Sequence, residues 1–264
     1  MPKVSVILPV YNCKDTLNDA INCIVNQTYK DWELVICDDC SKDGSYEIEM
    51  MYAREYPTKI KVLRNEENLM IAKTLNRCLE VAQGEYIARM DADDLCDPTR
   101  LEKQVDFLNS NPGLMVVGTA MRIFDQQGEK GIREATDKRN QFLSYSFSHP
   151  TILARKEMYD LLGGYSTDKS ITRCEDVDLW FRFTAFGMKG GIINEPLYSH
   201  RESEIDYQKR TIKKGIDCSK VIYRGCKLIG TPKWRYIFLL QPIVSAAMPY
   251  WLMHTYHQIK DRRG

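Results

Sequence analysis

The sequence predicts an α/β fold in which a mostly parallel sheet carries helices on both faces. Short apolar runs rich in strand-forming residues alternate with longer segments whose apolar residues recur at helical spacing. Several of these runs end abruptly at polar or acidic residues. The chain has 264 residues, 44% hydrophobic and 28% charged, which is enough for one large domain or a domain with an appendage and argues against disorder.

The first 110 residues repeat a strand followed by a helix. Apolar residues such as Leu17, Ile21 and Ile24 lie on one helical face, and Asp15 or Thr16 is available as the N-cap. The predicted strands are Val4–Leu8, Glu33–Cys37, Ile60–Leu63 and Tyr86–Met90, and the predicted helices start near Asp15, Ile48, Ile71 and Leu101.

The following 90 residues have a less regular pattern. Met115–Ala120 predicts a strand, and the polar segment Asp125–Asn140 predicts a loop or a protruding hairpin. Glu175 and Asp176 open a helix whose other residues are large and apolar. Acidic residues in a first turn can simply complement the helix dipole, so this pair alone does not identify a site.

Polar residues follow three of the predicted parallel strands. They are Pro9 to Asn12, Asp38 and Asp39, and Asp91 to Asp94. Ligands bind outside the carboxyl ends of such strands, so these tips should converge on one crevice. Neither a GxGxxG nor a GxxxxGK[ST] loop is present. Phosphate binding of the kind found in dinucleotide-binding folds or in P-loop proteins is therefore not expected.

The segment Asp91-Ala92-Asp93-Asp94 predicts a cation site. Three carboxylates within four residues repel one another unless a cation lies among them. Mg²⁺ and Mn²⁺ bind oxygen ligands, using one or two carboxylates together with substrate phosphates. The alternative is a solvated acidic turn. If this segment is considered alone, the solvated turn is the favoured interpretation.

The charges are distributed unevenly. From Arg201 onward there are thirteen Lys or Arg against five Asp or Glu, a local net charge of +8, although the whole chain carries +1. A basic end of this kind favours an anionic surface as partner. Nine cysteines without regular spacing, and a start that forms a strand at once, predict a reducing, cytoplasmic setting. Cys37 and Cys40 form an isolated C-x-x-C, for which we expect no zinc or redox role.

The basic end also contains an apolar run. A helical pattern runs from Ile205 to Ile229, Pro232 breaks it, and an uncharged stretch follows from Tyr236 to Met253. That stretch approaches the roughly 20 residues needed to span a bilayer. Its two prolines and terminal aromatic residues fit an interfacial segment better, with basic residues meeting anionic headgroups. The alternative is a hydrophobic hairpin packed on the domain or on a homodimer partner.

The segments VSVILPVYN, NQTYKDWELVICDDCSKDGS, ARMDADDLCDPTRLEKQ, GGY and EDVDLWFR occur in this order and spacing. Together they resemble the family 2 glycosyltransferases, which are nucleotide-sugar enzymes of the GT-A (Rossmann-like) fold. The similarity covers about Lys3 to Arg201. It implies a GT-A domain over residues 1–200 and a basic, aromatic helical extension over residues 201–264.

The resemblance also implies site residues. Pro9 and Tyr11 would line the nucleotide pocket, and Asp39 would accept a hydrogen bond from uracil N3, which favours UDP. Lys73 would lie near the diphosphate. The DxD motif would place Asp91 and Ala92 beside the nucleotide sugar and Asp93 on Mn²⁺ or Mg²⁺. Asp176 would be the catalytic base, with Glu175 and Trp180 on the acceptor side.

One carboxylate base opposite the leaving group predicts a single displacement. A retaining mechanism by analogy with glycosidases would need a carboxylate nucleophile near the anomeric carbon, and the sequence offers no separate candidate. We therefore expect an inverting hexosyltransferase that forms a β-linkage. The expected partners are a UDP-sugar, a lipid-diphosphate-linked saccharide of O-antigen or capsule synthesis, and the cytoplasmic face of the bacterial inner membrane.

Four residues depart from the family pattern or stay undecided. Cys40 and Met70 occupy positions where the family commonly has glycine. His200 is shifted relative to the family's histidine, so its role as a metal ligand or phosphate contact stays open. His149 is either an active-site residue or a loop histidine.

Three other functions were weighed. A sugar nucleotidyltransferase would need a Gly-rich loop after the first strand, which is absent. A catalytically silent, membrane-bound assembly partner would not need Asp39, Asp93 and Asp176. A nucleic-acid partner is not expected, because the basic residues accompany an apolar run.

Overall fold

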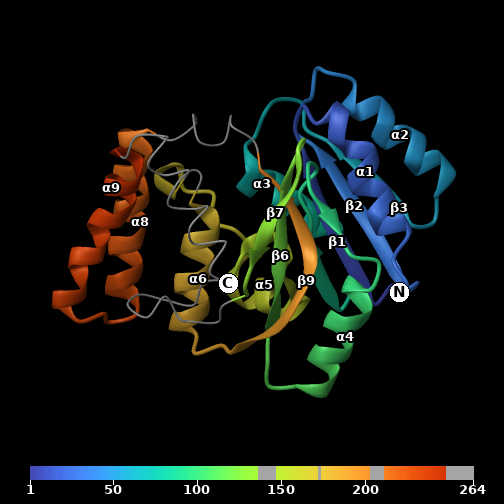
Figure 1. Ribbon diagram of the computed structural model, residues 1–264. Coiled ribbons are helices and arrows are strands. Elements are labelled where there is room, and N and C mark those ends of the chain that lie inside the picture. Colours follow the sequence, from blue (N-terminus) through green and yellow to red (C-terminus); the bar gives the residue numbers. More distant parts are fainter. Residues whose placement is uncertain (136–146, 172–173, 203–210, 248–264) are drawn as a thin grey trace.

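The protein forms one nine-stranded sheet with helices on both faces, and a helical extension stands beside it (Figure 1). The structure is a computed structural model that describes residues 1–135, 147–171, 174–202 and 211–247. The strand order is β3-β2-β1-β4-β8-β6-β9-β5, and β7 pairs with β6 outside this path.

The strands are β1 Val4–Val10, β2 Trp32–Asp38, β3 Ile60–Arg64, β4 Tyr86–Arg89, β5 Leu95–Cys96, β6 Val116–Asp125, β7 Gly128–Arg133, β8 Leu153–Arg155 and β9 Gly190–Arg201. The helices are α1 Lys14–Val25, α2 Ser45–Glu55, α3 Ile71–Val81, α4 Arg100–Ser110, α5 Lys156–Leu162, α6 Glu175–Ala185, α8 Ile212–Leu228 and α9 Gln241–Ala247. Short 3₁₀ helices cover His149–Thr151 (η1), Lys169–Ile171 (η2) and Lys233–Leu240 (η3).

The alternating residues of the central strands divide the core between the two faces. On β1, Val6 and Leu8 pack with residues of α1, α2 and α4, whereas Ile7 packs with residues of α3, α5 and α6. Successive side chains of a strand point to opposite faces, so a strand buried on both sides is apolar throughout. This explains why β1 and β2 are buried along their whole length.

The prediction of a mostly parallel sheet was wrong for the second half of the chain. The strands β1, β2, β3 and β4 are parallel, and β6 is parallel to β9. However, β8 runs antiparallel to both β4 and β6, β5 is antiparallel to β9, and β6 and β7 form an antiparallel hairpin. The pairing of β6 with β7 is antiparallel because a tight turn, rather than a crossover helix, joins these two strands. The hairpin expected between Asp125 and Asn140 is present over β6 and β7, and residues 136–140 lie outside the described part.

The start of α1 also differs from the prediction. Neither Asp15 nor Thr16 is the N-cap; Cys13 holds that position, and its side chain makes no capping bond. The carboxylate of Asp43 instead accepts a hydrogen bond from the Lys14 backbone N–H at 2.9 Å, and the Ser45 hydroxyl accepts one from the Cys13 N–H at 2.9 Å. The loop before α2 therefore satisfies donors at the start of α1, which local sequence does not reveal.

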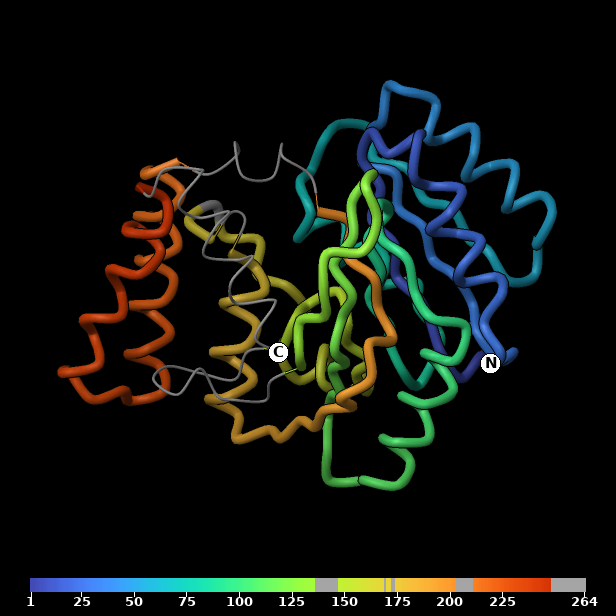
Figure 2. Tube along the Cα trace, in the orientation of Figure 1, coloured from blue at the N-terminus to red at the C-terminus, as the bar shows by residue number. Residues whose placement is uncertain are grey.

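The helical extension packs on α6 rather than on the sheet (Figures 1 and 2). Helix α8 is shorter than the predicted segment Ile205–Ile229, of which residues 205–210 lie outside the described part. Large apolar side chains of η3 and α9 remain exposed, among them Trp234 (65%) and Ile237 (67%). Within the described residues, none of the helices has the length and apolar character needed to cross a bilayer. The end of the apolar run, residues 248–253, is not described.

Candidate functional site

The tips of β1, β2 and β4 border one cavity of about 430 Å³, which we call the first cavity. The sequence prediction that three strand ends converge is therefore confirmed. The lining includes Pro9, Tyr11, Asp39, Asp91, Ala92 and Asp93, together with the 68–74 segment at the start of α3. Six of the residues expected around a nucleotide sugar thus meet at one place.

Asp39 forms the floor of this cavity and is only 4% exposed. Its Oδ1 accepts hydrogen bonds from Asn65 Nδ2 at 2.6 Å and from the Leu69 N–H at 2.7 Å, and its Oδ2 accepts one from the Met70 N–H at 3.0 Å. A carboxylate has about four lone-pair sites, so these contacts leave Oδ2 able to accept one more bond. No pattern in the sequence indicates that Asn65 supports this carboxylate.

Two residues that replace a family glycine adopt left-handed backbone conformations. Cys40 has φ 65°, and Met70 has φ 69° with ψ 162°. The Met70 values lie in a region that essentially only glycine occupies, which costs an L-residue about 1–3 kcal/mol. Asp39 holds this strained peptide through the Met70 N–H. The glycine preference at these positions therefore has a backbone cause.

The Asp91–Asp94 turn separates a buried anchor from an exposed carboxylate. Asp94 is 1% exposed and accepts hydrogen bonds from Tyr198 Oη at 2.8 Å and from the Arg201 N–H at 2.7 Å, which fixes the turn to β9. Asp93 is exposed to the cavity. Packing around its carboxyl, with the charges of Asp94 and Asp91, raises the pKa of Asp93 to about 6.

These features fit a divalent cation held mainly by substrate. Among the described residues there is no group of three or more His, Cys, Asp or Glu side chains that could hold a metal ion. Mg²⁺ and Mn²⁺ are often bound by one or two carboxylates and completed by phosphate oxygens and water. Asp93 is the residue that would hold such a cation. Its carboxylate is exposed, and the negative charges of Asp94 and Asp91 disfavour its ionised form, which a bound cation would stabilise.

The two uncertain histidines have different environments. His200 Nδ1 lies 3.1 Å from both oxygens of Asp94. Burial opposes protonation of His200, but the hydrogen bond and charge of Asp94 outweigh it and raise the pKa to about 9. His149 is 7% exposed, and its Nε2 lies 2.8 Å from Tyr165 Oη, so it is a core residue. Burial lowers the pKa of His149 well below its usual value.

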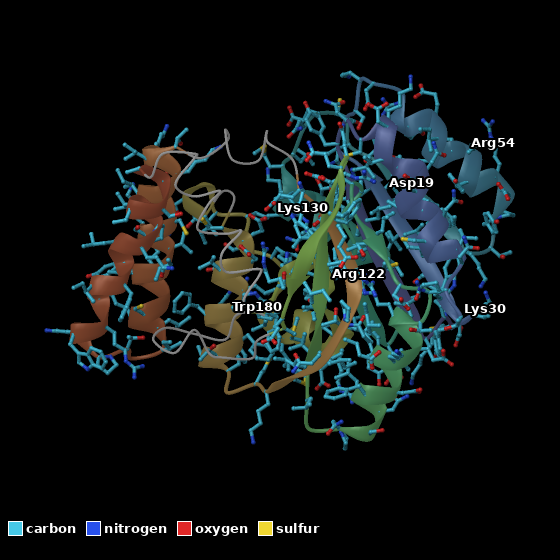
Figure 3. The ribbon with its side chains drawn as sticks, in the orientation of Figure 1. Asp19, Lys30, Arg54, Arg122, Lys130 and Trp180 are labelled. Carbon is cyan, nitrogen blue, oxygen red and sulfur yellow. The ribbon has the colours of Figure 1, made fainter. Side chains whose placement is uncertain are left out.

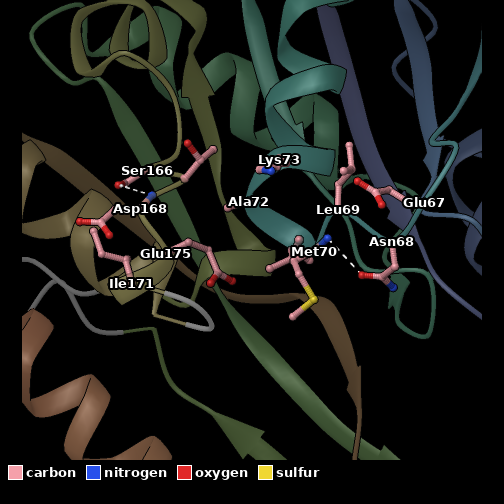
Figure 4. A pocket seen from close by; sticks show the side chains of 12 residues that line it. Glu67, Asn68, Leu69, Met70, Ala72, Lys73, Ser166, Asp168, Ile171 and Glu175 are labelled. Atoms are coloured by element: carbon pink, nitrogen blue, oxygen red, sulfur yellow. Dashed lines mark hydrogen bonds between the residues drawn. The ribbon is translucent and has the colours of Figure 1, made fainter.

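A second cavity of about 250 Å³ adjoins the first (Figure 4). The two share the wall formed by Asn68, Met70 and Ile71. Glu175 projects into the second cavity opposite Met70, with Ser166 and Asp168 beyond it. Lys73 lines this second cavity and is not among the residues of the first, so the structure places it with Glu175 rather than beside Asp91 and Asp93.

The carboxylates at the start of α6 have perturbed acidity. Burial raises the pKa of Asp176, although the Val177 N–H and the charge of Arg89 oppose the rise. Burial and the adjacent Asp176 raise the pKa of Glu175. A carboxylate whose pKa is raised toward neutrality is a better general base.

Trp180 is not at the surface of either cavity. It lies on the side of α6 that faces the sheet, is 2% exposed, and packs at 5.1 Å from the Phe147 ring (Figure 3). The acceptor-side position expected for Trp180 therefore becomes a packing position that fixes α6. Trp180 and Phe183 are three residues apart on α6, so the helical repeat places both side chains on the same buried face.

Arg89 is the residue of this region that the sequence analysis missed. It ends β4, is 6% exposed, and its Nη1 contacts Asp91 Oδ2 at 2.5 Å. Its charge also lowers the pKa of Glu175 and of Asp176. This guanidinium therefore contacts Asp91 directly, and its charge also acts on the two carboxylates at the start of α6.

Comparison with known proteins agrees with this arrangement. The model of glycosyl transferase family 2 matches residues 5–180. The chain belongs to glycosyl transferase family 2. Its resemblance to that family, inferred from the motifs, is thereby confirmed.

Two relatives of this family 2 glycosyltransferase match it over nearly the whole chain. Glycosyltransferase EpsE of Bacillus subtilis is 41% identical over 97% of this chain and 94% of its own. The amylovoran biosynthesis glycosyltransferase AmsE of Erwinia amylovora is 27% identical over 98% of this chain and 99% of its own.

Solved structures confirm the GT-A-like fold. The mannosyltransferase PcManGT of Pyrobaculum calidifontis, in complex with GDP-Man and Mn²⁺, has a TM-score of 0.73 at 18% identity over 93% of this chain and 73% of that one. S. aureus TarS 1–349, in complex with UDP-GlcNAc, has a TM-score of 0.68 at 18% identity over 91% of this chain and 70% of that one.

Proposed function

We propose that the protein is an inverting, metal-dependent glycosyltransferase that moves a hexosyl group from a UDP-sugar to a saccharide acceptor. The observation that carries this proposal is the pair of adjoining cavities, one bordered by Asp39 and Asp93 and the other by Glu175. A donor in the first cavity would present its sugar toward the wall at Met70, beyond which an acceptor would lie.

The chain's own residues supply binding and proton transfer. Asp39 accepts a hydrogen bond from the base through the free position on Oδ2, which suits the N3–H of uracil. Asp176 takes the proton of the acceptor hydroxyl as that oxygen attacks the anomeric carbon. The bond between that carbon and the diphosphate oxygen breaks, and its electron pair leaves with UDP. A cation bound at Asp93 would supply Lewis acidity to the diphosphate.

The acceptor is proposed to be a lipid-diphosphate-linked saccharide in bacterial surface polysaccharide synthesis. The polysaccharide role is supported by the relative named for amylovoran biosynthesis. The lipid is supported by the exposed apolar residues of η3 and α9 beside basic residues such as Lys233 and Arg235. The protein would then act at the cytoplasmic face of the inner membrane.

A donor screen tests the reaction. The purified chain is incubated with Mn²⁺ and UDP-glucose, UDP-galactose, their N-acetyl forms or GDP-mannose, and with lipid-diphosphate-linked acceptors, and products are identified by mass. We expect UDP and a β-linked product. Selective use of GDP-mannose would overturn the UDP assignment, and pyrophosphate formation would indicate a nucleotidyltransferase instead.

Site variants and a membrane assay test the remaining parts. Asp93→Ala should abolish Mn²⁺-dependent transfer, whereas Asp106→Ala, at an exposed position of α4, should not; equal activity of both would refute the metal assignment. Ile237→Ser, at an exposed position, should weaken binding to anionic phosphatidylglycerol vesicles without changing the melting temperature. Unchanged vesicle binding by this variant would count against the interfacial surface.

A further inference from the structure

Arg89 lies where the two halves of the site meet. It is the last residue of β4, the central strand that leads into Asp91. Two positions earlier, Ile87 packs with residues of α3, α5 and α6. Because side chains two apart on a strand share a face, Arg89 points to the face covered by α6.

The surroundings of Arg89 are buried and partly aromatic. The side chain is 6% exposed, and the backbone O of Arg89 accepts a hydrogen bond from Arg100 Nη2 at 2.8 Å. Its charge acts on Tyr159, Tyr165 and His149, which surround the same region. A buried cation is costly unless anions compensate it, so its position has to be explained by the carboxylates around it.

Only one of those carboxylates is bound directly. Arg89 Nη1 contacts Asp91 Oδ2, yet Arg89 Nε is buried without a hydrogen-bond partner among the described residues. On the acceptor side, Glu175 Oε2 is also buried without a partner there. An unpaired buried donor and an unpaired buried acceptor cost about 1–3 kcal/mol each, so both atoms have hydrogen-bonding capacity that the described residues do not use.

We propose that Arg89 is a positioning residue for the transfer reaction, which aligns Asp91 on the donor side with Glu175 and Asp176 on the acceptor side. This inference rests on the proposed function and deepens it. Nη1 of the guanidinium holds the Asp91 carboxylate, while the charge of Arg89 favours the anionic form of Asp176, the form able to accept a proton.

Other groups also face Asp176. Glu175 precedes it on α6, and the negative charges of the two carboxylates disfavour each other. The thiols of Cys174 and of Cys218, which lies on α8, also face Asp176, whose charge disfavours their thiolate forms. Among these groups, Arg89 is the cation whose charge favours the ionised form of Asp176. Removing it should therefore raise the pH at which Asp176 becomes an effective base.

Three variants separate positioning from general support. Arg89→Met removes the charge and keeps much of the volume, whereas Arg89→Lys keeps the charge without the fork. Arg155→Met is the matched control: Arg155 pairs with Tyr86 at the opposite end of β4 and donates to the Leu114 and Leu108 carbonyls at 3.0 and 2.9 Å.

The kinetic readout is kcat against pH, measured by release of nucleoside diphosphate from the donor that the screen identifies. Arg89→Met should lower kcat about 100-fold, because small misalignments cost this much, and should move the acid limb of the profile up by about one pH unit. Arg89→Lys should restore the limb and part of kcat. Arg155→Met should leave the limb in place.

A second readout requires no turnover. The carboxyl carbon of Asp176, assigned by comparison with Asp176→Asn, is titrated by ¹³C NMR in the wild type and in Arg89→Met. A higher titration midpoint in the variant supports the proposal, and an unchanged midpoint overturns it. If the wild type releases no nucleoside diphosphate from any donor, the proposed function fails, and this titration still decides the role of Arg89.

Discussion

The donor side and the acceptor side of the site differ in how well their polar atoms are satisfied. On the donor side, Asp39 and Asp94 each accept three or more hydrogen bonds from neighbouring backbone and side chains. On the acceptor side, Glu175 Oε2 is buried without a partner among the described residues. The first cavity is thus built in advance, whereas the second has hydrogen-bonding capacity left for a ligand.

The difference follows from the elements that supply the residues. Donor-side carboxylates come from the ends of the parallel strands β2 and β4, which neighbouring strands fix on both sides. Acceptor-side carboxylates come from the start of α6, whose position depends on packing by Trp180 and on contact with α8. The strands can therefore keep the donor-side carboxylates in place while the position and sequence of the acceptor-side residues change.

The largest expected effect concerns the acceptor side. Asp176→Asn should reduce transfer about 10³-fold while leaving UDP affinity within a factor of about two, because a general base contributes 10²–10⁴-fold and the donor does not need it. Single-turnover transfer and calorimetric UDP binding measure the two effects. Asp178→Asn, two residues further along α6, is the control. Loss of UDP affinity in Asp176→Asn would show that the two sides are not separable.

One buried carboxyl group near the donor side differs from Asp39 and Asp94 because its oxygens are not hydrogen-bonded to described residues. Glu49 of α2 is fully buried, and neither of its oxygens has a partner among the described residues. Burial, followed by the charges of Asp38 and Cys37, raises the pKa of Glu49 to about 9.

This exception predicts a pH dependence of stability. Because the folded state holds the proton up to about pH 9 and the unfolded state releases it near pH 4.5, the free energy of unfolding should fall as pH rises between these values. Glu49→Gln should remove this slope and stabilise the protein at pH 7 by about 3 kcal/mol. Denaturant unfolding from pH 4.5 to 9 measures it, with the exposed Glu47→Gln as control. A wild-type curve without slope would refute the neutral carboxyl.

A smaller effect is expected from loosening the donor side. Asp39→Asn replaces one acceptor oxygen by a donor that faces the Leu69 and Met70 N–H groups, so the 66–70 loop should lose its support. UDP affinity in the presence of Mn²⁺ should fall about 30-fold, as for loss of one charge-assisted hydrogen bond. Calorimetry measures this, with Asp160→Asn at an exposed position of α5 as control. Equal affinities would contradict a preformed donor pocket.

The smallest expected effect tests the wall between the cavities. Met70→Gly should raise the free energy of unfolding by about 1 kcal/mol, because glycine occupies the Met70 backbone conformation without strain. The same change at Met51, an exposed helical position, should lower it by a similar amount. Thermal unfolding distinguishes the two, and destabilisation by Met70→Gly would mean that side-chain contacts of Met70 outweigh its strain.

Local sequence patterns were sufficient to predict the alternation of the first four strands and helices and the carboxylates at the strand ends. These features are local: an apolar run of strand formers, a helical spacing and an acidic turn depend on neighbouring residues alone. Asp39, Asp91 and Asp93 could therefore be expected at one crevice, and all three line the first cavity, whereas the role of Asp176, which the resemblance supplied, stays a prediction. The long strand β9 was missed because Glu195 and Pro196 interrupt its apolar pattern.

The contacts by which distant residues support the site can be seen in the tertiary structure but not in the local sequence. Asn65 on Asp39, Tyr198 and His200 on Asp94, and Asp43 at the start of α1 are contacts across 26 or more residues. Lys73 and Trp180 could be placed on helices, but the cavity or core that each contacts depends on how α3 and α6 pack on the sheet. Arg89 was hidden because an arginine at a strand end is usually solvated, and only burial beneath α6 makes its charge act on both groups of carboxylates.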